Sequence, residues 1–201
     1  MVLTSDVSTL KVGETATLTI TLSEASSDFT ADDISTTGGS ITAFSGSGTS
    51  YQATFTPTDD SNADGVISVS SPKFSDAAGN TNNAASNIVT LSVDTVEPTI
   101  SIASDVTALK VGETATLTIT LSEASSDFVL EDITATGGSI TAFSGSGTSY
   151  QATFTPEDNL TGTAEINVSS PKFFDAAGNN NEVSNIVTLS VDTVEPTISI
   201  A

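Results

Sequence analysis

The chain repeats itself almost unchanged at an interval of about half its length. The twenty-residue run that starts at Leu10 returns at Leu109, and the run that starts at Gly38 returns at Gly137. By Ser86 and Ser184 the interval is one residue shorter, so the second copy lacks one residue in the stretch before Ser184. Self-similarity at a fixed, domain-sized period is typical of an array of folded repeats.

The repeats predict the domain boundaries. We expect one domain at 1–95, a second at 96–193 and the start of a third at 194–201, because Glu195–Ala201 repeats Glu97–Ala103. We interpret Met1 as an added start residue. The sequence after it has the pattern of a strand and not of a signal peptide, so we expect any export signal to lie outside this sequence.

Within each copy, hydrophobic residues alternate with Thr and Ser. This alternation predicts antiparallel sheets with one buried and one solvated face. About seven such segments in about 98 residues favour an all-β protein with two tandem immunoglobulin-like β-sandwich domains, and a small barrel is the alternative. No Cys and no Trp occur, so the antibody-type core is excluded. The segments expected in the second copy are Thr99–Ser104, Thr114–Leu121, Asp132–Thr136, Ser139–Phe143, Ser149–Thr155, Ala164–Ser169 and Asn185–Asp192.

The charge is strongly acidic, with 25 Asp and Glu against 4 Lys and Arg and a formal net charge of −21. Such a chain repels nucleic acid and anionic membranes. High charge is also found in disordered chains, but here 37% of residues are hydrophobic and they stand in alternating runs, which favours a fold. The absence of His and Cys excludes the usual catalytic triads and thiolate metal sites. No stretch has the ~20 apolar residues of a membrane-spanning helix.

Two further motifs occur in both copies. DAAGN stands at Asp76–Asn80 and at Asp175–Asn179, and VDTVEPT stands at Val93–Thr99 and at Val191–Thr197. With these motifs the chain resembles, over its whole length, the bacterial Ig-like (Big) repeats of giant RTX-type adhesins. The resemblance implies an extender that projects a terminal ligand-binding region from the cell surface, with calcium at the domain junctions. Within DAAGN we expect the glycine at positive φ and the asparagine in local backbone hydrogen bonds.

Acidic residues concentrate where the linker is expected to meet the second domain. In a seven-strand sandwich, the second, fourth and sixth connecting loops share the end at which the first strand begins. The linker with Asp94, Glu97 and Pro98 should therefore meet loops that carry carboxylates, and calcium binds six to eight oxygen ligands in irregular loops. The alternative is that these acids are solvated and keep the chain soluble. The expected ligands at this junction are Asp94, Glu97 and Asp175, with Glu123 or Asp127 as alternatives for a further carboxylate. The other candidates are Asn179 in the same loops and the matching positions elsewhere, Glu24, Asp28, Asp76, Asp192 and Glu195.

A second candidate calcium loop belongs to the first copy alone. Asp60, Asn62 and Asp64, followed by Gly65, match the first half of an EF-hand loop. The Glu that closes such a loop is replaced by Ser71, and the second copy lacks the pattern. The loop is therefore either a calcium site private to the first domain or an acidic turn.

Three classes of function compete. We expect no enzyme. The usual triads need His or Cys, which the chain lacks, and the adjacent carboxylates Asp32 and Asp33 would point to opposite faces of a strand instead of facing each other across a substrate. A carbohydrate- or protein-binding adhesion module is the alternative, although only Tyr51 and Tyr150 offer large polar aromatics. We expect an extracellular, monomeric spacer at the bacterial surface, rigidified by calcium at its linkers, whose partners are the neighbouring repeats and which neither binds nucleic acid nor inserts into membranes.

Overall fold

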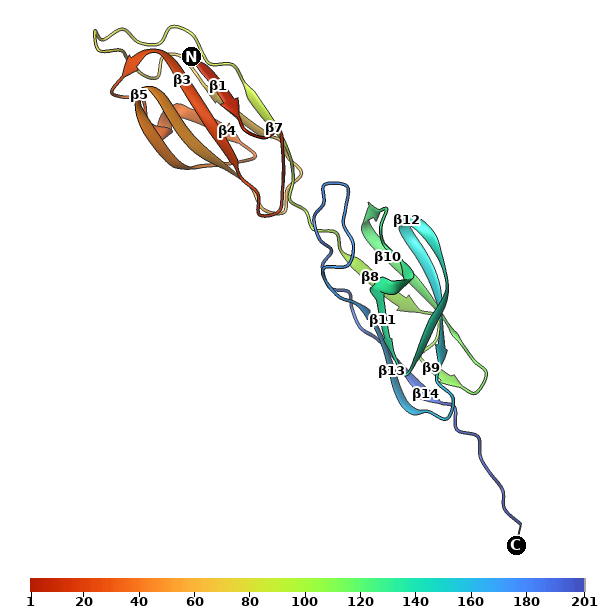
Figure 1. Ribbon diagram of the computed structural model, residues 1–201. Helices are drawn as coiled ribbons and strands as arrows, with labels where there is room; N and C mark the ends of the chain where they lie inside the picture. The colour runs from red at the N-terminus through yellow and green to blue at the C-terminus, as the bar shows by residue number, and fades with distance from the viewer. Residues whose placement is uncertain (201) are drawn as a thin grey trace. The chain divides into compact units, whose positions relative to one another are not determined.

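The computed structural model describes residues 1–200 and is built almost entirely of strands (Figure 1). The chain divides into two compact units, Met1–Val96 (unit 1) and the residues from Glu97 onward (unit 2). Each unit is a sandwich of one three-stranded and one four-stranded sheet. The predicted all-β fold with two tandem immunoglobulin-like domains is therefore confirmed, and the barrel alternative is not.

Unit 1 has its three-stranded sheet in the order β1-β3-β5 and its four-stranded sheet in the order β2-β7-β6-β4. All pairs are antiparallel except β2 and β7, which run parallel. A short 3-10 helix, η1 (Ala31–Asp33), links the sheets. The strands are β1 (Val2–Ser5), β2 (Thr9–Lys11), β3 (Ala16–Ser26), β4 (Ile34–Thr37), β5 (Gly39–Pro57), β6 (Gly65–Val69) and β7 (Val89–Asp94).

Unit 2 repeats this topology, with the sheet orders β12-β10-β8 and β11-β13-β14-β9. β14 and β9 run parallel, and the other strand pairs in the described part of unit 2 are antiparallel. Its elements are β8 (Ile100–Ser104), β9 (Ala108–Lys110), β10 (Ala115–Ser125), η2 (Leu130–Asp132), β11 (Ile133–Thr136), β12 (Gly138–Pro156), β13 (Thr161–Val168) and β14 (Val187–Asp192). The three-residue strand β9 was not among the predicted segments, because so short a segment carries no measurable alternation.

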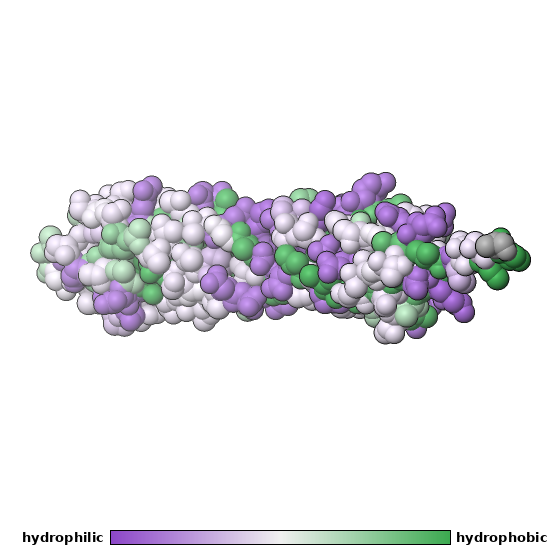
Figure 2. All heavy atoms as spheres, turned by 90° about the horizontal axis from the view of Figure 1, so that it is seen from below, coloured by the Kyte–Doolittle hydropathy of each residue, from purple (hydrophilic) through white to green (hydrophobic). Residues whose placement is uncertain are grey.

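The core of each unit comes from the alternation seen in the sequence. Leu18 and Ile20 on β3 are fully buried, whereas the flanking Thr17 and Thr21 are exposed. Phe55 in unit 1 and its counterpart Phe154 in unit 2 are 0% exposed and belong to the core of their sandwiches. The outward positions leave a mostly polar surface with scattered hydrophobic patches (Figure 2).

The strand β12 doubles back on itself. Thr141 Oγ1 lies 3.5 Å from the Thr153 carbonyl oxygen, and the Glu157 backbone N–H donates to the Gly137 carbonyl oxygen at 3.0 Å. The segments predicted at Ser139–Phe143 and Ser149–Thr155 are thus the two arms of one continuous strand assignment, folded at the glycine-rich turn between them. Among residues 1–200, no helix is long and apolar enough to cross a membrane.

Candidate metal centre

The turn Asp175–Asn179, between β13 and β14, holds its own carboxylate in place. Asp175 Oδ1 accepts hydrogen bonds from the backbone N–H groups of Gly178 at 2.7 Å and Asn179 at 2.9 Å. The Asn179 side-chain amide donates to Oδ2 at 2.8 Å, and the Asp175 N–H donates to the Asn179 carbonyl oxygen at 3.2 Å. Gly178 has a φ of +88°, which glycine adopts without strain. The turn fixes the carboxylate while Oδ2 keeps a lone pair for another ligand.

The same turn is formed at Asp76–Asn80 in unit 1. Asp76 Oδ1 accepts the N–H groups of Ala78 and Asn80, both at 2.8 Å, and Oδ2 accepts the Asn80 side-chain amide. The side-chain amide of Asn80 and then its backbone N–H lower the pKa of Asp76, because both stabilise the charged carboxylate. Gly79 also lies at a φ of +88°. The predicted roles of the glycine and the asparagine in DAAGN are confirmed in both units.

A second carboxylate in unit 2 lies beside Asp175. Glu123, near the end of β10, has a side-chain oxygen within 4.8 Å of one on Asp175. Glu123 is half-buried, Asp175 is 8% exposed and Asn179 is 2% exposed. Two carboxylates at this spacing and this depth favour a cation that neutralises both. They are the part of unit 2 best suited to bind a metal ion.

The chain enters unit 2 beside this pair. The carbonyl oxygen of Pro98, which is buried, accepts the Glu182 N–H at 2.9 Å. Thr99 N–H donates to Ser122 Oγ at 2.8 Å, and Ser122 N–H donates back to the Thr99 carbonyl oxygen at 2.9 Å. Ser122 precedes Glu123, so the entering segment runs along the residues that carry the carboxylate pair. This confirms, within unit 2, the predicted end at which the loops and the first strand meet.

Asp94 is the last residue of β7, at the end of unit 1 from which the chain leaves. It stands in parallel register with Lys11, and its Oδ1 accepts the Val96 N–H at 3.3 Å. The next residue, Thr95, is buried, and its hydroxyl donates to the Thr58 carbonyl oxygen at 2.7 Å. Asp94 is thus anchored to unit 1 three positions before Glu97, with which unit 2 begins.

Asp28 and Asp127 join two loops of their own units. Asp127 Oδ1 accepts the Ser125 hydroxyl at 2.6 Å and the Phe174 N–H at 3.2 Å. Asp28 accepts the Ser26 hydroxyl, and it also accepts both the N–H and the hydroxyl of Ser75. The Ser26 hydroxyl first, and then Ser75, lower the pKa of Asp28 to about 2. Of the two alternatives for the further carboxylate in unit 2, Glu123 lies beside Asp175. Asp127 instead acts as a brace that joins the loop after β10 to the loop that contains Phe174.

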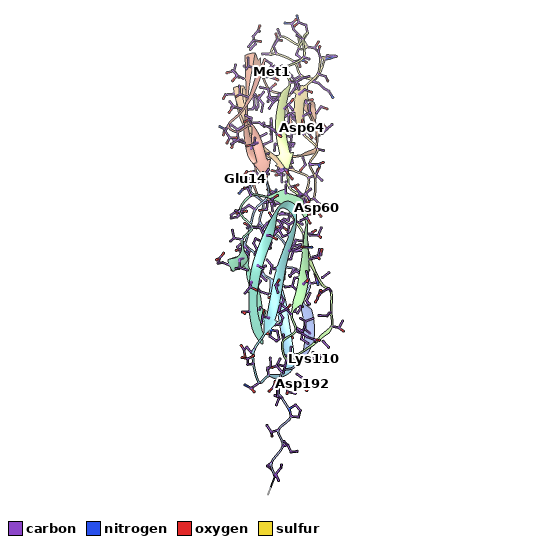
Figure 3. All side chains as sticks on the ribbon, turned by 90° about the vertical axis from the view of Figure 1, so that its right-hand side faces the viewer. Met1, Glu14, Asp60, Asp64, Lys110 and Asp192 are labelled. Atoms are coloured by element: carbon purple, nitrogen blue, oxygen red, sulfur yellow. The ribbon has the colours of Figure 1, made fainter. Side chains whose placement is uncertain are left out.

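The loop with Asp60, Asn62 and Asp64 is exposed in unit 1 (Figure 3). Asp60 has a φ of +52°, and the Ala63 N–H bonds to Ser61 Oγ at 3.2 Å. The acids in this loop do not form a cluster of three within 4.8 Å anywhere in residues 1–200. Strand β6 runs straight from Gly65 to Val69, so Ser71 lies at the far end of a strand and cannot close the loop. A calcium ion here would need other ligands.

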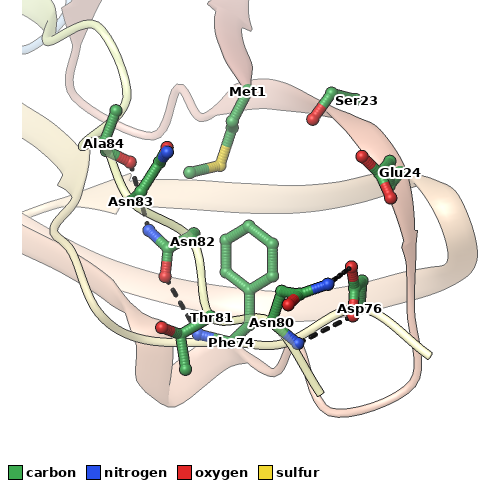
Figure 4. Close-up of a pocket in the computed structure, with 10 residues that line it drawn as sticks. All are labelled: Met1, Ser23, Glu24, Phe74, Asp76, Asn80, Thr81, Asn82, Asn83 and Ala84. Carbon is green, nitrogen blue, oxygen red and sulfur yellow. Dashed lines mark hydrogen bonds between the residues drawn. The ribbon is translucent and has the colours of Figure 1, made fainter. Parts of the chain in front are cut away.

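The remaining candidates are Asp192 and Glu195, at and after the end of the last strand of unit 2, and Glu24 in β3 of unit 1. Asp192 ends β14 in register with Lys110 and accepts the Thr161 hydroxyl at 3.1 Å (Figure 3). Glu195 is exposed. Glu24 lines a pocket in unit 1 together with Asp76 (Figure 4).

Two structural asparagines escaped the sequence analysis. Asn181 is fully buried; its Oδ1 accepts the N–H groups of Lys172 and Phe173, and its Nδ2 donates to the carbonyl oxygens of Ser169 and Glu182. In unit 1, Asn82 accepts the N–H groups of Lys73 and Phe74 and donates to the carbonyl oxygens of Ser70 and Ala84. The available signal was their position after DAAGN in both copies, but a polar residue in a polar loop gives no sign of burial.

Comparisons with known proteins agree with this architecture. The family model for a bacterial Ig-like domain matches residues 1–93 and again residues 94–191. No match was found among curated proteins.

Similar solved structures include invasin, a bacterial integrin-binding protein, at 14% identity and a TM-score of 0.45, with 96% of this chain and 40% of that chain covered. The Yersinia pseudotuberculosis adhesin InvE follows at 11% identity and a TM-score of 0.35, with 95% and 58% covered. A titin I9–I11 tandem is similar at 8% identity and a TM-score of 0.34, with 96% and 66% covered. This chain therefore spans about two-fifths to two-thirds of these structures. By its two family matches, the chain belongs to the bacterial Ig-like domain family.

Proposed function

We propose that the chain is a pair of extender repeats from a large secreted surface adhesin of the RTX type, which holds a distal ligand-binding region away from the bacterial cell. Membership of the bacterial Ig-like family and two nearly identical units in tandem support this role. The chain would be extracellular and non-enzymatic, and would contribute to adhesion and biofilm formation by its length. Residues 194–201 would begin a third repeat after repeats at 1–95 and 96–193.

The observation that carries the mechanism is the carboxylate pair Glu123 and Asp175 beside the entry of the chain into unit 2. We propose that Asp94 joins them to hold one calcium ion. Glu97 stands three positions after Asp94, a reach of at most about 11 Å at ~3.6 Å per residue, so a short linker would allow Asp94 to reach the same ion. Glu97, Asn179 and Asp127 are further oxygen donors for the same ion.

The chemistry of these donors fits calcium. Calcium takes six to eight oxygen ligands with loose geometry, and three carboxylates supply the charge that its binding needs. Asp175 is already held by its turn, so little conformational entropy is lost when it binds. Asn, Asp and Glu are all oxygen ligands, and the chain has no Cys or His that would favour a softer metal.

A calcium ion bound by residues from both sides of the linker would restrict bending between the repeats. The equivalent site at the entry of unit 1 would use Glu24, Asp76 and Asp28 with a preceding linker, and Asp192 and Glu195 would serve a following repeat. The exposed loop of Asp60, Asn62 and Asp64 is a separate, weaker candidate in unit 1. Extracellular calcium is high enough to fill sites with Kd values of ~10⁻⁴–10⁻³ M.

Small-angle X-ray scattering and thermal melting, with calcium and with EDTA, test this function. We expect calcium to narrow the distribution of interdomain distances and to raise Tm, and Glu123→Gln to remove both effects. Glu165→Gln is the matched control, because it removes an equally charged but exposed carboxylate from β13. Identical scattering and melting in calcium and EDTA would eliminate the calcium mechanism.

A further inference from the structure

The strand β5 folds back on itself, and its two arms have different neighbours (Figure 1). Residues 50–55 pair with β3. Residues 39–45, which we call the outer arm, lie on their other side, where the Thr42 hydroxyl donates to the Thr54 carbonyl oxygen at 3.4 Å. Within residues 1–200, the sheet order ends at β5 and no strand pairs with the far side of the outer arm. The outer arm is therefore an edge of its sheet.

The outer arm lacks the features that usually protect an edge strand. Protein edges are kept short or carry charged residues, because an unpaired row of backbone N–H and C=O groups is a template for another strand. The edges of the other sheet follow this rule, since β2 and β4 have three and four residues and β2 includes Lys11. In contrast, β5 has 19 residues and no charged side chain. The outer arm is thus open to an additional strand.

The side chains of the outer arm form a half-buried side and an exposed side. Ile41 and Phe44 are half-buried and pack against the core of unit 1, whereas Ser40 and Thr42 are exposed. A strand added to this edge places apolar side chains beside Ile41 and Phe44, and hydroxyl side chains beside Thr42. The segment that fits the edge therefore alternates small apolar residues with Thr or Ser, as the strands of this chain do.

Acidic residues lie at both ends of the outer arm. At its end, the ring of Phe44 lies 5.7 Å from that of Phe29, and η1, with the exposed Asp32, follows Phe29 closely in the chain. At its start, the exposed Asp64 has its backbone carbonyl against Gly38, which precedes the arm. The chain also has a net charge of −21, so the field along this edge attracts cations. An extended cationic segment complements both the edge and its charge.

We propose that the outer arm of unit 1 binds an extended segment of a partner protein that carries Lys or Arg, and that this segment adds to the sheet as a further strand. Backbone hydrogen bonds supply the affinity, and cationic side chains at the two ends of the segment lie near Asp32 and Asp64. A segment of about seven residues, at ~3.4 Å per residue, matches the length of the outer arm. A repeat with this edge holds a partner at its side, which goes beyond the role of a spacer.

Unit 2 has the same arm sequence at residues 138–144 but a poorer site. Ala142 has a φ of +48°, whereas its counterpart Ala43 does not have a positive φ. A left-handed residue bends a strand and disturbs the row of backbone groups at its edge. In addition, Thr163 stands where unit 1 has Asp64, so the start of this arm lacks its acid. The two arms therefore give a comparison within one molecule.

NMR of the isotope-labelled full chain in EDTA, titrated with the peptide Lys-Thr-Val-Thr-Val-Thr-Lys, tests the proposal. We expect saturable shifts of the backbone amide signals of residues 39–45, and slower hydrogen exchange at these amides. Binding should weaken as salt is added, because the charges are exposed. The same peptide with Glu at both ends should bind at least about tenfold more weakly. A central Pro should abolish binding, because it cannot join a strand ladder.

A matched pair of variants tests the charge at the two ends. Asp32→Asn with Asp64→Asn should weaken binding of the Lys peptide about fivefold, as expected for the loss of two exposed ion pairs. Glu131→Gln with Glu165→Gln is the control, because it removes the same charge from exposed positions of unit 2 and should leave binding unchanged. Equal weakening by the two variants would show attraction to the whole chain and overturn the proposed site.

Three other results overturn the proposal. The first is no shift at residues 39–45, or equal shifts at residues 138–144. The second is equal binding of the Lys peptide and of its Glu or Pro form, since these forms lack the charge and the strand. The third is dimerisation of the chain without peptide, seen by sedimentation velocity and lost in Thr42→Glu, which would assign the edge to a second copy. EDTA removes calcium from all these tests, so their outcome is separate from that of the proposed function.

Discussion

The two DAAGN turns share the bond from the Asn side chain to the Asp carboxylate, but they differ in one backbone donor, Ala78 in unit 1 and Gly178 in unit 2, and in exposure. Asp76 is half-buried and Asn80 is exposed, whereas Asp175 and Asn179 are buried. The five residues of the turn are the same in both units, so the DAAGN sequence alone does not set how deeply its carboxylate is buried.

The loops after β5 and β12 differ in sequence, unlike the two DAAGN turns. Ser61 and Leu160 occupy the same place, as each donates its N–H to the buried threonine that follows the last strand. After them unit 2 has Thr-Gly-Thr and starts β13 at Thr161, while unit 1 has Asn-Ala-Asp and starts β6 only at Gly65. Thr is common in strands, whereas Asn and Asp are rare there, so the acidic loop of unit 1 leaves β6 shorter than β13.

The largest effect should come from the buried asparagines. Asn181→Ala leaves two backbone N–H groups and two carbonyl oxygens without their partner in a fully buried place, and should cost about 3 kcal/mol of unfolding free energy. Asn82→Ala should cost less, about 1–2 kcal/mol, because water reaches the half-buried site in unit 1. Urea unfolding of the two variants measures both values, and equal costs would mean that exposure does not separate the units here.

The glycines Gly38 and Gly137 test the difference between the loop after β5 in unit 1 and the loop after β12 in unit 2. A Cβ on Gly38 would lie 2.3 Å from the Asp64 carbonyl oxygen, whereas one on Gly137 would meet Leu160 and Ala164 at 3.1–3.2 Å. Both glycines have positive φ, so both alanine variants carry the backbone strain of about 1 kcal/mol. We expect Gly38→Ala to cost about 2 kcal/mol more than Gly137→Ala, because a backbone atom cannot move aside as a leucine can. Thermal melting of the pair should show the larger loss in unit 1.

Calcium should distinguish the two turns. At free calcium about ten times Kd, binding would stabilise the native state by about 1.4 kcal/mol, and Asp175→Asn should abolish this gain. Asp76→Asn disturbs the turn with the same sequence in unit 1 but not the proposed junction ion, so this variant should keep most of the gain. Calorimetry with and without EDTA compares them, and loss of the calcium effect in Asp76→Asn alone would assign the ion to unit 1.

The smallest effect concerns the braces, Asp28 and Asp127. Since the pKa of Asp28 is lowered to about 2, its contribution to stability is fully present above its unfolded pKa of about 3.8 and is lost as the pH falls towards 2. Ser75→Ala removes one of the hydroxyl groups that lower this pKa, so the Asp28 pKa should rise, as followed by NMR titration of its carboxyl carbon. An unchanged titration would show that the Ser26 hydroxyl and the Ser75 N–H lower this pKa without help from the Ser75 hydroxyl.

Much of the fold was predictable because its causes are local. Alternation identified the strands, and the glycine in each DAAGN turn gave the positive φ correctly. The candidate site was predictable only in outline. The choice between Glu123 and Asp127 depends on where β10 ends relative to the loop before β14, which is a tertiary relation that spacing does not contain. Asn181 shows the same limit, because its burial follows from a loop that wraps around it.

The parallel pairing of β2 with β7, and of β9 with β14, has a mechanical consequence. In each unit the second strand lies beside the last strand, in the same direction, over three residue pairs. A force that pulls the two ends of a unit apart therefore drives these strands past each other and loads their hydrogen bonds together. Bonds sheared together resist more than bonds opened one after another, so each repeat should yield late and all at once under tension.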